Sequence, residues 1–221
     1  MQDKFFAHDI IQSSLYDKLN SHFLEKYYIH KKSLHKLFQS IDLKDKYSNN
    51  NMYYKYTKIS DDFNSVCDSF EYAVNLIIQR GYKDFGLEGR MRGTIHGLMS
   101  NPELKNWEKE MLSLRRHEKD FIIRNEDKYV ELHRLECSKL FTHWVNSGVK
   151  SEQINELNKY QSQFDTLVQL ENRIGLKIQH GLRYNILKQT TELENSISAL
   201  IDDVVILNNT VLNTYKFAFR S

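Results

Sequence analysis

The sequence predicts an all-α protein. Only one proline and eight glycines occur in 221 residues, and so little turn chemistry favours a few long elements over a fold of many short strands. Apolar side chains recur at helical spacing along most of the chain. Hydrophobic residues make up 40% and charged residues 27% of the sequence. This balance is typical of packed helices with wide polar faces and argues against disorder.

The first predicted element is one helix over residues 5–41, where apolar and aromatic side chains repeat near helical spacing. It would be roughly 50 Å long at 1.5 Å per residue. The polar run 43–57 predicts a loop. A second helix is expected after Asp61 and Asp62, whose negative charges suit a helix N-terminus, and Gly81 ends it.

A short helix is predicted over residues 86–99. Asn101 then stands where an N-cap is needed, and Pro102 occupies the first helical position. The helix that begins there continues to about Arg124.

The last third of the chain predicts further helices. An acidic pair at 126–127 opens one that runs to residue 146 and stops before Gly148. From residue 151 the helical periodicity continues to residue 219, with an interruption expected around Gly175 and Gly181.

An internal repeat relates two parts of the chain. Residues 70–74, followed later by Gly86, resemble residues 164–168, followed later by Gly181, and a leucine comes after each of these glycines. Beyond them the apolar positions also correspond, Met91 with Ile186 and Leu98 with Leu193. The repeat predicts two similar helical modules.

Composition argues against several functions. Thirty-one Lys and Arg against 29 Asp and Glu leave a net charge of +2, which gives no electrostatic basis for binding nucleic acid or an anionic membrane. The sequence has no Gly-rich phosphate loop and no nucleophile in a recognisable turn, so we expect neither an enzyme nor a cofactor.

Cysteines and histidines give no metal-site pattern. Cys67 and Cys137 form no CxxC pair and are expected to be buried thiols. His133 and Glu136 have the i,i+3 spacing of half a di-iron motif, but no second copy accompanies them. We therefore expect no metal site.

The segment 111–121 carries the most informative charges. On a helical wheel Arg115 and Glu118 fall inside an apolar stripe, while Arg116 and Lys119 lie toward its edge. Buried charges require compensation. Two interpretations stay open: an internal Arg115–Glu118 ion pair, or an Arg115 guanidinium that Glu118 orients toward the carboxylate of a ligand.

The helix over residues 86–99 has a strip of three glycines, Gly89, Gly93 and Gly97, opposite its apolar face. Such a strip allows a close helix crossing or leaves a groove for a small ligand. Three basic residues flank the strip: Arg90, Arg92 and His96. They are either solvated charges or contacts to a bound anion.

These motifs resemble a known family. Residues 115–121, followed by Arg124 and by residues 128–130, resemble the RRxEKDF…R…KYV signature of helical bimodular sensor domains. Residues 86–92, with Ile95 and His96, resemble the GLxGxLRxAVH element that precedes it. Such domains are the extracytoplasmic ligand-binding regions of bacterial methyl-accepting chemotaxis receptors and of some sensor histidine kinases.

The resemblance implies two stacked four-helix bundles that share long helices, one membrane-proximal and one distal. Residues 1–221 would form one periplasmic sensor domain, excised from between two transmembrane helices, with both termini at the membrane-proximal end. It also implies a homodimer, and a small anionic organic acid as ligand, recognised by arginines. The sequence lacks a signal-peptide pattern and a long apolar run, and its helical periodicity reaches both ends, as expected of such an excised domain.

Two alternatives accompany this reading. One is the sensor domain of a histidine kinase that recognises a periplasmic binding protein. The other is a structural helical module without a ligand.

Overall fold

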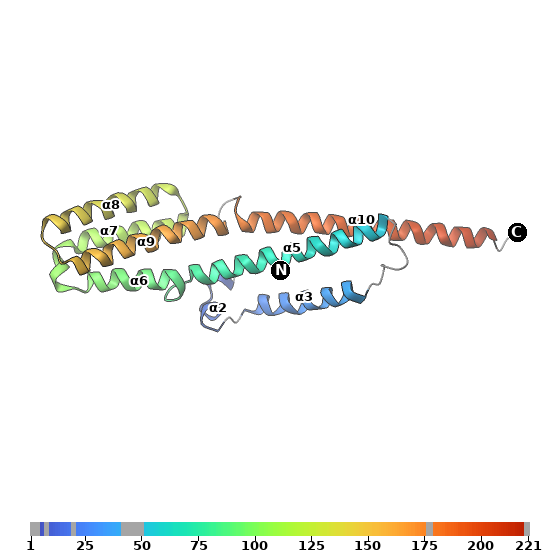
Figure 1. Cartoon of the computed structure of the whole chain (residues 1–221), viewed down its shortest axis with the longest axis horizontal. Coiled ribbons are helices and arrows are strands. Elements are labelled where there is room, and N and C mark those ends of the chain that lie inside the picture. The colour runs from blue at the N-terminus through green and yellow to red at the C-terminus, as the bar shows by residue number, and fades with distance from the viewer. Residues whose placement is uncertain (1–4, 7–8, 19–20, 41–50, 176–178, 219–221) are drawn as a thin grey trace.

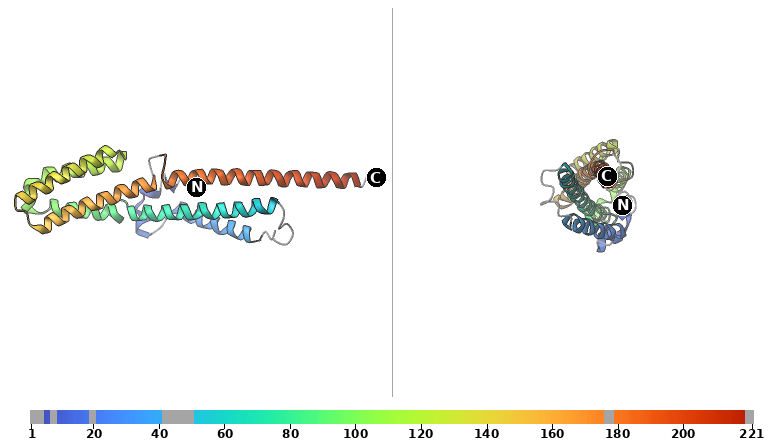
Figure 2. Two further views of the ribbon diagram at one scale, coloured as in Figure 1. Left: turned by 45° about the horizontal axis from the view of Figure 1, so that its top comes forward. Right: turned by 90° about the vertical axis from the view of Figure 1, so that its right-hand side faces the viewer.

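The computed structural model describes residues 5–6, 9–18, 21–40, 51–175 and 179–218. Every regular element within these ranges is a helix, which confirms the predicted all-α class. The helices form an elongated molecule with one group at each end (Figures 1 and 2). No helix in the described ranges has both the length and the apolar character needed to cross a membrane.

One end of the molecule is built on two long helices that lie side by side, α5 (Asn51–Arg80) and α10 (Leu182–Ala218) (Figure 1). Helix α3 (His22–Ser40) lies along α5. Its Tyr27 hydroxyl donates to the Cys67 carbonyl at 3.3 Å, and its Lys31 forms a 2.6 Å ion pair with Glu71. Apolar side chains of α3, α5 and α10 fill the space between these helices.

The other end gathers four helices around the largest apolar cluster (Figures 1 and 2). They are α6 (Gly86–Met99), α7 (Glu108–Arg124), α8 (Asp127–Asn146) and α9 (Ser151–Ile174). Helix α6 packs along α9 and α7 packs along α8, whereas α6 and α7 approach each other less closely. Trp144, Tyr160 and Phe164 are completely buried in this core.

The two parts of the internal repeat form similar junctions, from α5 to α6 and from α9 to α10. Gly81 and Gly175 have φ angles of +80° and +71°, and each lies against a second glycine, Gly86 or Gly181. A Cβ atom on Gly81 or Gly175 would lie 2.0 Å from a backbone carbonyl oxygen. Only glycine fits such a junction, because L-residues rarely adopt this φ and the space is already filled.

The expectation of one unbroken helix over residues 5–41 is wrong. The described part contains a 3₁₀ turn η1 (Asp9–Ile11), a short helix α2 (Ser13–Lys18) and α3 from His22. The Ser21 hydroxyl accepts from the Leu24 amide at 3.1 Å and caps α3. The chain breaks because Phe5 and Leu15 turn into the core against α5, which a straight helix would not allow. Residue 41 lies outside the described residues.

The expected loop over residues 43–57 is also partly wrong, since α5 begins at Asn51 and not after Asp62. Tertiary contacts hold this polar turn in a helix. The Tyr56 hydroxyl donates to the Phe38 carbonyl at 2.5 Å, and Lys55 pairs with Asp203 of α10 at 2.5 Å. Residues 43–50 lie outside the described part.

Other boundaries are confirmed. The side chain of Asn101 accepts from the Glu103 amide at 2.9 Å, although the turn that it caps, η2 (Pro102–Trp107), is 3₁₀ before α7 continues as an α-helix. Helix α8 ends at Asn146, and the expected interruption falls at Gly175.

Phe5 and Ala218 are the first and last described residues, and they lie far apart (Figure 1). The termini themselves, which are expected to lie together, are outside the described residues. Phe5 packs edge-on against Phe70 within α5, with ring centroids 5.5 Å apart. Helix α10 instead continues to Ala218 at the far end of the molecule (Figure 1). Phe5 therefore lies toward the middle of the molecule.

Candidate anion-binding site

Helix α7 places the charged motif as the helical wheel predicts. Met111, Leu114 and Phe121 are buried in the core, so the apolar stripe is confirmed. Glu118 lies inside it and is only 4% exposed, while Arg115 is half-buried. Glu118 therefore leaves bulk water and needs a partner, whereas Arg115 leaves it only in part.

The partner of Glu118 is Tyr160 of α9, on the other side of the core. The Tyr160 hydroxyl donates to Glu118 Oε2 at 2.6 Å. Burial raises the pKa of Glu118, and the hydrogen bond from Tyr160 and the charge of Arg115 oppose this rise. No ion pair joins Arg115 to Glu118 among the described residues, so the expected pair is not the contact that satisfies this carboxylate.

Arg115 is left with hydrogen-bonding capacity. Its Nη1 atom is buried and has no hydrogen-bond partner in the part of the chain that the structure describes. It borders the seam between α6 and α7, which approach each other less closely than α6 and α9 or α7 and α8 do. An unpaired buried donor of this kind costs about 1–3 kcal/mol or more when it is charged.

Helix α6 brings further positive charge to the same seam. Partial burial lowers the pKa of His96, and the charges of Arg115, Arg92 and Lys119 lower it further. These four groups therefore lie close enough to act on one another. Arg92 is already partly neutralised, because it bonds Asp84 at 3.0 Å and lies 3.9 Å from Glu88.

The remaining predicted residues lie outside this cluster. Arg90 on α6 and Arg116 on α7 are exposed, and neither is among the charges that lower the pKa of His96. The structure thus brings Arg92, His96, Arg115 and Lys119 close together. Glu118 lies next to Arg115 on the same helix and is bonded to Tyr160.

The glycine strip of α6 does border a groove. A Cβ atom on Gly93 or Gly97 would meet nothing within 4 Å, whereas Gly89 is packed against the backbone of Asp84. The groove measures about 250 Å³ and lies between α6 and α9. Its charged lining residues are Glu152 and Glu156, so the strip and the basic residues belong to different surfaces.

Sequence reasoning missed a buried charge network where α5, α6 and α9 meet. Arg80 Nη1 donates to Glu88 Oε2 at 2.9 Å, and Arg80 Nη2 lies 2.7 Å from Glu171 Oε1. The amide of Lys83 also donates to Glu88, at 3.2 Å. A helical wheel would have found Arg80 and Glu171, because both follow the apolar stripes of their helices; no sequence signal pointed to Tyr160.

Both cysteines are buried free thiols, as predicted. Burial raises the pKa of Cys67, and it raises that of Cys137 to about 12. His133 is 0% exposed and stacks on Phe164, and burial lowers its pKa to about 3. These groups are neutral at physiological pH.

No family model, curated protein or solved structure matches this chain.

Proposed function

We propose that this chain is the extracytoplasmic sensor domain of a transmembrane chemoreceptor and that it binds a small organic anion at the seam between α6 and α7. The single observation that carries this proposal is the buried, unpartnered Nη1 of Arg115. A ligand carboxylate would accept from this atom, and charge-assisted hydrogen bonds of this kind are stronger than neutral ones.

The surrounding charges support an anionic ligand. Lys119, Arg92 and His96 all lie near Arg115. Glu118 is held by Tyr160 at 2.6 Å, on the core side, and so does not occupy the outer donors of Arg115. Carboxylate recognition by a planar guanidinium also fixes the orientation of the ligand.

The arrangement of helices supports the bimodular part of the proposal. In this reading α6–α9 form the distal bundle, and α3, α5 and α10 with the N-terminal segment form the proximal one. The runs α5–α6 and α9–α10 each pass from one bundle into the other through a glycine junction. The membrane would lie beyond the end of α10, with the domain in the periplasm.

Arg92 suggests how binding would be transmitted. It lies 3.9 Å from Glu88, which is bonded to Arg80 of α5, and Arg80 in turn pairs with Glu171 of α9. A ligand that attracts Arg92 would therefore change the charge balance at the junction of α5, α6 and α9. Such a ligand would shift the helices because it favours one packing over the other through differential contacts.

A homodimer is part of the same proposal. Helix α10 exposes several large apolar side chains in its middle part, among them Ile197, Ile201 and Val205, which share one face at i,i+4 spacing. An exposed apolar helix face of this length favours a partner helix, here from a second copy.

The test is calorimetric titration of the chain with acetate, succinate, malate and citrate. We expect a saturable heat for at least one of them, with affinity reduced at least tenfold in Arg115→Ala. Arg116→Ala is the matched control, because it removes the same charge from the neighbouring exposed position, and we expect it to bind as the wild type does. Equal losses in the two variants would contradict a site at Arg115.

A second candidate is a sensor that recognises a periplasmic binding protein. The exposed Leu132, Leu135 and Val145 of α8 favour it, since they offer apolar contacts on the outer surface of the four-helix end. If none of the acids gives a heat of binding, and both arginine variants fold correctly, the result would favour this function or a purely structural module over direct sensing.

A further inference from the structure

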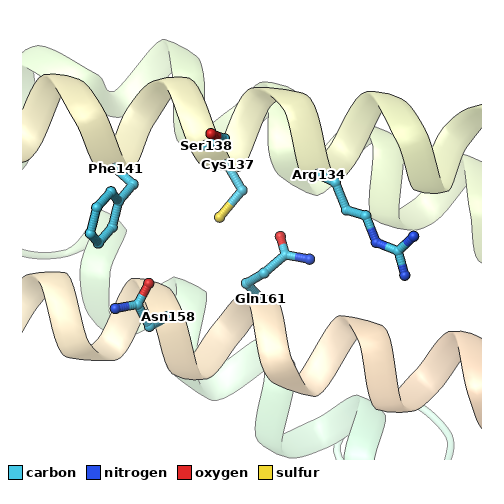
Figure 3. A pocket seen from close by; sticks show the side chains of 6 residues that line it. All are labelled: Arg134, Cys137, Ser138, Phe141, Asn158 and Gln161. Atoms are coloured by element: carbon cyan, nitrogen blue, oxygen red, sulfur yellow. The ribbon is translucent and has the colours of Figure 1, made fainter.

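A second groove lies between α8 and α9, away from the α6–α7 seam. It measures about 290 Å³, close to the lower limit of typical small-molecule sites. Helix α8 lines it with Arg134, Cys137, Ser138 and Phe141, and α9 lines it with Asn158 and Gln161. Figure 3 shows the Cys137 thiol and the Gln161 amide facing each other, with Phe141 and Asn158 together at one end.

The charges of this groove are already neutralised. Arg134 bonds Asp165 through Nε at 2.9 Å and through Nη2 at 2.8 Å. The remaining lining groups are a thiol, a hydroxyl, two amides and an aromatic ring, all uncharged. A ligand that enters this groove therefore gains nothing from carrying a charge and would lose hydration on doing so.

One acceptor in the groove lacks a well-aligned hydrogen bond within the described residues. Gln161 Nε2 donates to Asp165 Oδ2 at 3.1 Å, which fixes the amide orientation because a carboxylate only accepts here. The opposite atom, Gln161 Oε1, is buried and unpartnered among the described residues. Figure 3 shows this oxygen directed toward Cys137.

The ring nitrogens of His133 are further buried polar atoms beside the same groove. It lies one helical turn before Cys137, is fully buried and is close to the side chain of Gln161. Neither of its ring nitrogens forms a well-aligned hydrogen bond within the described residues, although the Gln161 side chain is near enough to act as a hydrogen-bond partner and opposes the lowering of the His133 pKa. Buried polar groups without partners are uncommon in native proteins and require an explanation.

We propose that the α8–α9 groove binds one small uncharged aromatic heterocycle that carries an N–H donor next to a ring acceptor. The N–H donates to Gln161 Oε1, the acceptor takes a hydrogen bond from the Asn158 amide or the Ser138 hydroxyl, and the ring rests against Phe141. Phe141 is 37% exposed and so has a free face for this contact. Amide side chains suit such ligands because they offer a donor and an acceptor side by side.

The experiment uses adenine as the probe and the two cysteines as reporters. Both thiols are buried, so we expect both to alkylate slowly, but only Cys137 lines the groove, whereas Cys67 lies in the α5 core. We expect saturable slowing of Cys137 alkylation, followed by peptide mass spectrometry, with the rate at Cys67 unchanged. Equal protection of both thiols, or none at millimolar probe, would overturn the proposal.

Variants locate the effect. Gln161→Leu keeps the size of the side chain but removes the acceptor, and we expect it to weaken protection at least tenfold. Gln169→Leu, at an exposed position of the same helix, is the matched control and should leave protection unchanged. If Gln161→Leu does not fold, Phe141→Ala at the groove rim replaces it, with the same loss expected. An unchanged response in the groove variant would also refute the site.

This site is independent of the anion site. Arg115→Ala should leave protection of Cys137 by adenine intact, and acetate or succinate should not protect Cys137. If these acids slow Cys137 alkylation and the effect requires Arg115, the change at Cys137 is a consequence of binding at the α6–α7 seam. That result would contradict a separate heterocycle site.

Discussion

Arg80 at the end of α5 and Glu171 near the end of α9 form a buried ion pair, with Nε and Nη2 of the arginine 2.8 and 2.7 Å from the same carboxylate oxygen. The pair joins α5 to α9 close to the glycine junction that follows each helix. A second carboxylate, Glu88, shares the guanidinium from the first turn of α6. The Arg80 side chain thus connects α5, α6 and α9 where the two groups of helices meet.

Loss of Arg80 should destabilise the protein strongly. Arg80→Met keeps the aliphatic volume but leaves Glu88 and Glu171 buried without a cation, and we expect a loss of about 3–5 kcal/mol in the free energy of unfolding. Urea denaturation followed by circular dichroism measures it. The triple variant with Glu88→Gln and Glu171→Gln removes the stranded charges and should regain much of the loss. If Arg80→Met lowers the free energy of unfolding by less than about 1 kcal/mol, the network does not stabilise the fold substantially.

Alanine at the junction glycines should act in the opposite direction from alanine in the α6 strip. Gly81→Ala would force a Cβ to 2.0 Å from the Phe85 carbonyl at a φ of +80°, and a loss of more than about 1 kcal/mol is expected. Gly97→Ala meets nothing within 4 Å in a helix interior, so a gain of about 0.5–1 kcal/mol is expected. Thermal unfolding compares the two. Similar effects of both substitutions would contradict the junction geometry.

The buried His133 should make stability depend on pH. Its pKa is lowered to about 3 in the folded state, against about 6.5 unfolded. Its neutral form is therefore fully compatible with folding above pH 6.5, and stability falls as the pH drops from 6.5 toward 3, because the unfolded chain binds the proton first.

The slope from this one group is about 1.4 kcal/mol per pH unit. It is isolated by subtracting the pH profile of His133→Leu from that of the wild type, since Glu118 has a raised pKa and contributes with the opposite sign as the pH rises above its unfolded value. Parallel profiles for the two proteins would mean that His133 is hydrated in solution.

The charge cluster of the α6–α7 seam predicts a measurable coupling between His96 and Arg115. Removal of the arginine charge by Arg115→Ala should raise the pKa of His96, because that charge is one of the causes that lower it. Titration of the His96 ring protons by NMR measures the change without any ligand. Arg116→Ala should leave the His96 pKa unchanged; a shift of equal size in both variants would place His96 away from Arg115.

The candidate site was predictable only in part. The period of α7 put Arg115 and Glu118 on the core-facing side, because burial follows from local helical geometry. The wheel could not show that Glu118 bonds Tyr160, which lies 42 residues further along the chain. Nor could it show that the glycine strip and the arginines of α6 belong to different surfaces, since that depends on which helix packs against each side.

The sequence by itself determined the helical class, the capping Asn101, the breaks at Gly81 and Gly175, and the buried stripe of α7. Each of these depends on interactions over a few residues, or on a φ angle that glycine alone adopts freely. The tertiary structure decided where the first helix breaks, how early α5 begins, and that Arg80 meets Glu171. Those outcomes depend on contacts between segments far apart in the chain, such as Lys55 with Asp203 and Phe5 with Phe70. Contacts of this kind override local propensity because burial at the packed interface contributes more free energy than the preferences of single residues.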